Sequence, residues 1–89
     1  MKTISKYGLA IADEQIVMMP SLSHPKHVAM QNGEPYLWAE VLDHLLIYEH
    51  RRIFIIATGA QIPPKAVEYI GTCHGDLCSW HVYDGGLVV

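Results

Sequence analysis

The sequence predicts a small, mainly β domain over residues 1–89, a barrel or sandwich of six to seven short antiparallel strands with one short helix left open. Three observations support this fold class. Glycine, proline and asparagine recur at intervals of roughly 8 to 12 residues, as expected where short strands end in turns. Several intervening segments alternate apolar and polar residues, and residues 51–59 are rich in β-branched and aromatic side chains. A chain of 89 residues is enough for one such domain and no second.

The first half of the chain contains four candidate strands. Residues 3–11 and 14–19 are apolar segments separated by an Ala-Asp corner, and residues 27–30 alternate in polarity. The dipeptide Asn32-Gly33 follows, which is a strong hairpin signal because both residues tolerate a positive φ. We therefore expect residues 35–41 to return antiparallel to residues 27–30.

The second half contains three more candidate strands. Residues 51–59 form one, and residues 67–74 and 77–83 form a final hairpin around Gly75-Asp76. Residues 64–69 begin with a proline and also fit a short helix, which Gly71 would stop.

Residues 35–50 fit two secondary structures equally well. Pro35 suits the first position of a helix, and apolar residues recur at helical spacing. These residues are Leu37, Val41, Leu45 and Tyr48. From the pattern alone, a helix and a strand–loop–strand both stay open.

The densest group of potential metal ligands lies in residues 72–81, which hold Cys73, His74, Cys78 and His81. A two-residue loop at Gly75-Asp76 would place Cys73 opposite Cys78, so the thiols would meet simply as hairpin neighbours. The Cys-x4-Cys spacing is unusual for zinc, and His81 would point to the other face from Cys78. We expect two half-buried thiols here, with a structural zinc and a disulfide as the alternatives.

The remaining sequence contains no pattern typical of an enzyme. His24 and His27 are separated by two residues in a predicted loop, and there is no H-E-x-x-H, G-x-S-x-G or phosphate-loop motif. We therefore expect no catalytic residues, no bound metal and no cofactor.

Composition restricts the partners of the chain. Apolar residues make up 51% of it and charged residues only 17%, which is more apolar material than one small core needs, so we expect a homo-oligomer. The net charge of -3 and the lack of basic runs argue against binding of a DNA or RNA polymer. We expect no membrane span and no signal peptide, and hence a cytoplasmic location in a bacterial host cell.

Five segments, in this order, resemble a family of short, uncharacterised proteins encoded by tailed phages and prophages. They are SKYGLAIADEQIVMMP, VAMQNGEPYLWAEV, RRIFIIATGAQIPP, EYIGT and HVY. The family pattern is K-Y-x-L, D-E-Q, M-P, Q-N-G-x-P-x-L-W-A, T-G-x-x-I-P and Y-I-G-T, and it covers nearly the whole chain. The resemblance implies strand–loop–strand for residues 35–50, because the relatives are rich in Pro and Asp where they match residues 42–50. The final hairpin is shorter here, and Cys73 and Cys78 are not part of the pattern.

The resemblance implies a phage setting and no specific activity. By analogy with phage proteins that bind and hide the nucleotide signals of bacterial immunity, we expect an accessory, anti-defence protein that sequesters a cyclic dinucleotide or an ADP-ribose derivative without cleaving it. A protein-interaction module that inhibits a host or phage partner is the second hypothesis. The third is an enzyme that cleaves such a signal, with His24 or His27 as general base.

The predicted ligand-binding residues divide by chemistry. Tyr36 or Trp38, which share one face of residues 35–41, would stack on the base. Arg51 and Arg52 would bind the phosphates. Hydrogen bonds to the ligand would come from Gln31, Thr58 and Gln61. The plainer alternatives are a core or interface tryptophan, a solvated strand end, and a rigid turn before Pro63 and Pro64.

Overall fold

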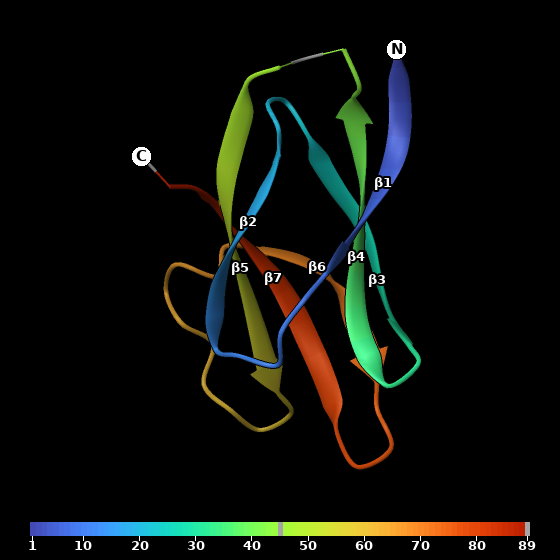
Figure 1. Cartoon of the computed structure of the whole chain (residues 1–89). Coiled ribbons are helices and arrows are strands. Elements are labelled where there is room, and N and C mark those ends of the chain that lie inside the picture. The colour runs from blue at the N-terminus through green and yellow to red at the C-terminus, as the bar shows by residue number, and fades with distance from the viewer. Residues whose placement is uncertain (45, 89) are drawn as a thin grey trace.

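Two antiparallel β-sheets pack face to face in the computed structural model, which describes residues 1–44 and 46–88 (Figure 1). The three-stranded sheet has the order β1-β4-β3 and the four-stranded sheet the order β2-β5-β7-β6. The strands are β1 (Lys2–Gly8), β2 (Glu14–Pro20), β3 (His24–Gln31), β4 (Glu34–Leu42), β5 (Tyr48–Ala57), β6 (Glu68–His74) and β7 (Ser79–Leu87). The predicted mainly β fold is confirmed, and the two open sheets make it a sandwich.

The core forms because alternate residues of each strand face the opposite sheet. Leu37, Ala39 and Val41 of β4 are buried, and they pack with buried residues of the four-stranded sheet such as Ile53 and Val82. Leu37, Ile53 and Val82 are completely inaccessible to solvent. Tyr36 and Trp38 point to the other side of β4, as the alternation predicts.

The Asn32-Gly33 hairpin is confirmed. Asn32 has a φ of 52° and Gly33 a φ of 79°, so both residues take the left-handed conformation of a tight hairpin turn. Gln31 pairs with Glu34 directly beside the turn, and the register runs back along β3 and β4 with one shift near Pro25.

The two helices considered from the sequence do not form among the described residues. Residues 34–42 are strand, and a strand begins again at residue 48, so the strand–loop–strand alternative is confirmed. Leu45, which contributed to the helical spacing, lies outside the described residues. Residues 64 and 65 form a turn, and residues 68 and 69 already belong to β6. No helix in the described part of the chain is long and apolar enough to span a membrane.

The predicted register of the final hairpin is wrong. Cys73 faces Trp80, and His74 faces Ser79, so the loop holds four residues rather than two. The Gly75 N–H donates to the Cys78 carbonyl at 2.9 Å, which closes this longer loop. Cys73 therefore points into the core, Cys78 lies in the loop, and both cysteines are free.

The edge strands β3 and β6 lie against each other on one side of the sandwich. Gly71 permits this approach, because a Cβ atom at that position would lie 2.9 Å from Val28 Cγ2. A small second cluster covers the outer face of the four-stranded sheet, where Phe54, Ile56 and Tyr83 pack with Ala66 of the β5–β6 connection.

Candidate functional site

The outer face of the three-stranded sheet carries an aromatic group centred on Trp38. The Trp38 ring lies 5.7 Å from that of His27 on β3 and 6.3 Å from that of Tyr36 on β4, measured between centroids. The interplanar angles to Trp38 are 47° for His27 and 54° for Tyr36, so neither ring stacks parallel on the Trp38 face. Trp38 is half-buried, which leaves part of its surface open to a ligand.

Basic side chains flank this aromatic group. Lys6 of β1 holds its Nζ 4.7 Å from the centroid of the Tyr36 ring and donates a hydrogen bond to Gln31 Oε1 at 3.1 Å. Lys26 Nζ lies 3.8 Å from a Glu40 carboxylate oxygen in an exposed ion pair. Both ammonium groups remain available to an anion, because exposed pairs of this kind are weak.

A shallow hollow of about 390 Å³ lies beside Trp38. It combines an aromatic ring, an aliphatic side chain, a cation, an imidazole and a carboxylate within one surface feature. Its lining residues are Ile4, Lys26, His27, Trp38, Ala39 and Glu40. Such a mixture suits a planar, polar molecule of moderate size better than a purely apolar one.

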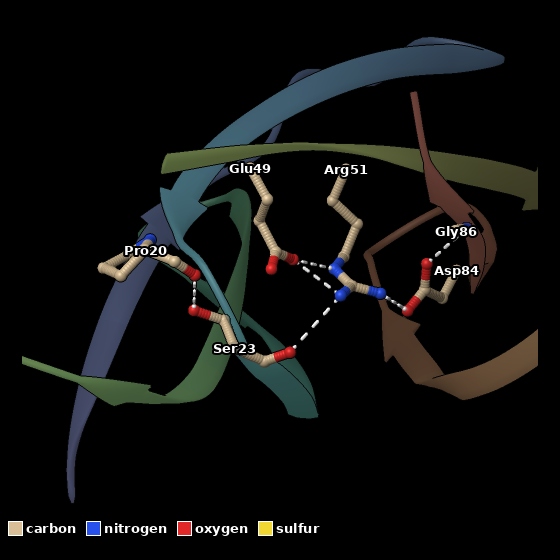
Figure 2. Close-up of polar contacts among 6 residues, drawn as sticks. All are labelled: Pro20, Ser23, Glu49, Arg51, Asp84 and Gly86. Atoms are coloured by element: carbon tan, nitrogen blue, oxygen red, sulfur yellow. Dashed lines mark hydrogen bonds and ion pairs between the residues drawn. The ribbon is translucent and has the colours of Figure 1, made fainter. Parts of the chain in front are cut away.

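Arg51 belongs to an internal ion network rather than to this face (Figure 2). Its Nε donates to Glu49 Oε2 at 2.8 Å, its Nη1 donates to Asp84 Oδ2 at 2.6 Å, and its Nη2 donates to the Ser23 carbonyl at 3.3 Å. The Ser23 hydroxyl donates to the Pro20 carbonyl, and the Gly86 N–H donates to Asp84 Oδ1 at 2.7 Å. Arg51 thus ties β5, β7 and the β2–β3 connection together.

Burial makes this network a structural element. Glu49 and Asp84 are buried, and the Arg51 side chain is only 14% exposed. Desolvation disfavours the charged guanidinium, but the hydrogen bonds and charges of Glu49 and Asp84 outweigh it, so the pKa of Arg51 is raised. All three guanidinium nitrogens already have hydrogen-bond partners, which leaves Arg51 few donors for a ligand.

Arg52 points to the opposite face of β5, as neighbouring residues of a strand must. It pairs with Glu14 on β2, where Arg52 Nε lies 3.1 Å from Glu14 Oε2 without the alignment of a hydrogen bond. The structure therefore does not bring Arg51 and Arg52 together as a single anion clamp.

Thr58 and Gln61 lie in the connection after β5, at the four-stranded sheet. Thr58 Oγ1 is 2.7 Å from His81 Nε2, and Thr72 Oγ1 is 3.0 Å from His81 Nδ1, so His81 links two hydroxyl groups. The Tyr69 hydroxyl extends this chain beyond Thr72. Gln61 instead lines a separate pocket of about 440 Å³.

The structure thus gathers three of the seven predicted residues, Gln31, Tyr36 and Trp38, on one face, and it distributes Arg51, Arg52, Thr58 and Gln61 elsewhere. Lys6, Lys26 and His27 join the first group and were missed in the sequence. The position of His27 could have been predicted. A two-residue turn at Asn32-Gly33 fixes the register of β3 and β4, and this register places His27 opposite Trp38.

No group of three or more His, Cys, Asp or Glu side chains suited to a metal ion occurs within residues 1–44 and 46–88. Cys73 is 1% exposed, and burial raises the pKa of its thiol, which favours the neutral form. The longer final loop removes the geometric reason to link Cys73 with Cys78.

Comparison with known proteins adds a family and no activity. No curated protein and no solved structure matches the chain. One family model matches residues 1–87, which is nearly the whole chain, and its description is "Domain of unknown function (DUF7352)". The protein therefore belongs to the DUF7352 family.

Proposed function

We propose that this protein binds a small nucleotide on the outer face of the three-stranded sheet and sequesters it without cleaving it. The biological role that accords with the phage resemblance is that of an anti-defence protein acting on an immune signal such as a cyclic dinucleotide or an ADP-ribose derivative. One observation carries the proposal, namely the partly open Trp38 ring with His27 and Tyr36 beside it and Lys6 and Lys26 at either flank.

Each part of this face has a role in the proposal. Trp38 stacks on the base, since every nucleobase offers a π-face. Lys6 and Lys26 attract the phosphates, and they do so from different strands, β1 and β3. Gln31 and Glu40 offer hydrogen-bonding groups that favour one base or sugar over another.

A ligand-depletion assay tests the proposal directly. The purified protein is incubated with a panel of cyclic dinucleotides and ADP-ribose derivatives and removed by filtration, and the filtrate is analysed by chromatography. The protein is then heat-denatured and the released material is analysed. A compound that disappears and returns intact supports sequestration. A compound that returns as fragments supports instead the cleaving enzyme with His24 or His27 as base, and a panel that stays entirely in the filtrate contradicts nucleotide binding.

A pair of tryptophan variants tests the site. Trp38→Ala is expected to weaken binding by about 1–3 kcal/mol, or roughly 5- to 150-fold in Kd, since that is the usual contribution of base stacking on an aromatic side chain. Trp80→Phe is the matched control, because Trp80 lines the pocket at the other sheet and should leave Kd unchanged. Equal affinity of wild type and a folded Trp38→Ala protein would show that the ligand binds elsewhere.

A protein-interaction module is the second candidate, and one observation favours it. Large apolar side chains are exposed along β2, where Ile16 is 47% and Met18 is 55% accessible. An inhibitor of a host or phage protein would use such a patch. Recovery of one stoichiometric host protein on the immobilised chain, lost on substitution of Met18 and retained on substitution of Trp38, would support this candidate over nucleotide binding.

A further inference from the structure

The four edge strands of the sandwich differ in how they are protected from pairing with another chain. Exposed edges in natural proteins usually carry lysine, proline, a bulge or a covering segment. β1 has Lys2 and Lys6, and β3 has a register shift at Pro25 and His27 with Lys26 between them. β6 has a register shift between Tyr69 and Gly71 and lies against β3.

The strand β2 has none of these features along its central residues. It runs as Glu-Gln-Ile-Val-Met-Met-Pro, it contains no lysine or arginine, and its register with β5 is uninterrupted over all seven residues. Its only charge, Glu14, is already paired with Arg52. Among the described residues β2 is hydrogen-bonded only to β5, so its other edge has no strand partner.

The backbone groups on the open edge of β2 follow from two hydrogen bonds at its ends. The Ser21 N–H donates to the Ile47 carbonyl at 2.8 Å, and the Ile55 N–H donates to the Asp13 carbonyl at 3.3 Å. The backbone N–H and C=O groups of successive residues point to opposite sides of an antiparallel strand. Those of the odd-numbered residues of β2 therefore point toward β5. Glu14, Ile16 and Met18 therefore direct their N–H and C=O groups outward, whereas Pro20 has no N–H and its carbonyl already accepts the Ser23 hydroxyl.

The structure points to an occupant of this edge, and we infer that it is the β2 strand of a second copy of the chain, paired antiparallel about a two-fold axis through Val17. In this register Ile16 lies opposite Met18 of the other copy and exchanges both backbone hydrogen bonds with it. Glu14 lies opposite Pro20, so no like charges face each other, and the ladder ends at this pair. Val17 meets its own symmetry mate.

A second copy fits this edge better than an unrelated strand because the sequence of β2 is complementary to itself in this register. The exposed Ile16 and Met18 of both copies come together on one face, beside Tyr48, which is 53% exposed. Shifting the two-fold axis to Met18 would place Pro20 opposite Ile16, so Ile16 would lose the exchange of both backbone hydrogen bonds that it makes with Met18 in the first register. The result is an isologous dimer with a continuous eight-stranded sheet.

Sedimentation velocity and residue-resolved amide exchange test the dimer. The wild-type chain is expected to sediment as a dimer at tens of micromolar, with the Ile16 and Met18 amides protected from exchange. Met18→Lys puts a charge on the exposed face of the contact and should yield a folded monomer in which those two amides exchange rapidly. Ile4→Lys is the matched control, because Ile4 is 66% exposed on β1 and its substitution should leave the dimer intact.

A cysteine at the two-fold axis provides an independent measurement. In a Cys78→Ser background, Val17→Cys should form a disulfide-linked dimer under mild oxidation, because directly opposed residues in such a pair have Cα atoms about 4.5 Å apart. Ile4→Cys in the same background should not. A monomeric wild type, a dimer that survives Met18→Lys, equal loss with Ile4→Lys, or no cross-link at position 17 would each overturn the inference.

Discussion

Replacing Arg51 by methionine is expected to destabilise the fold strongly, because it leaves Glu49 and Asp84 as buried charges without a cation. The carboxylate side chains of Glu49 and Asp84 are only 6% and 7% exposed, and each lies 2.6 Å from an Arg51 nitrogen. Removing one partner of a buried ion pair costs about 3–5 kcal/mol. An 89-residue domain has a total stability of roughly 4–13 kcal/mol. Arg51→Met should therefore remove about a quarter of it or more.

The contribution of Arg51 to the free energy of unfolding is expected not to change between acidic and mildly alkaline pH. In the wild type the pKa of Arg51 is raised, so its stabilisation is fully present below the unfolded-state pKa and disappears only at extreme alkaline pH. Arg51 itself therefore does not make the free energy of unfolding depend on pH below that extreme.

Urea denaturation followed by the fluorescence of Trp38 and Trp80 measures the free energy of unfolding of wild type and variant. Arg52→Met is the neighbouring control, because its partner Glu14 is 47% exposed and a pair of that kind contributes about 1 kcal/mol or less. If Arg51→Met and Arg52→Met cost the same, the structural role assigned to this network is wrong.

Three further outcomes follow from the packing and turns of the sandwich. Gly71→Ala should cost about 1–3 kcal/mol, because its Cβ would lie 2.9 Å from Val28 Cγ2, and its combination with Val28→Ala should cost less than the sum of the two single variants in urea titrations. Gly33→Ala should cost about 1 kcal/mol with no steric clash, because Gly33 has a φ of 79° and open space around it; a loss of several kcal/mol in thermal unfolding would contradict this. Iodoacetamide should modify Cys78 well before Cys73, whose burial raises its thiol pKa, as mass spectrometry of briefly labelled protein would show; equal rates would mean that the β6–β7 hairpin opens readily.

Local patterns predicted those parts of the fold that depend on neighbouring residues. The alternation in β4 separated Tyr36 and Trp38 from Leu37 correctly, because side chains of a strand alternate between its faces whatever the rest of the chain does. Asn32-Gly33 predicted a hairpin because the two positive φ angles are a property of the dipeptide itself.

The errors and omissions depend on contacts between distant segments. Gly75-Asp76 resembled a two-residue turn, but the hydrogen bond from Gly75 to Cys78 closes a longer loop and shifts Cys73 away from Cys78. Lys6 comes close to Tyr36 only through the pairing of β1 with β4, which no local pattern specifies. The separation of Arg51 from Arg52 could have been predicted from the sequence, because adjacent residues of a strand point to opposite faces.

The strand order has a consequence for how the chain reaches this structure. Of the strand pairings, β3–β4 and β6–β7 join consecutive strands, whereas β1–β4, β2–β5 and β5–β7 close longer loops. Loop closure costs entropy before the distant contacts compensate for it, so folding is expected on the slow timescale of β-sandwiches, with the two local hairpins forming early. During synthesis β2 cannot pair until β5 has been made, some thirty residues later. Until then the apolar residues of β2 lack the strand that they pair with in the folded sheet. A nascent chain is therefore most exposed to misassociation before β5 leaves the ribosome.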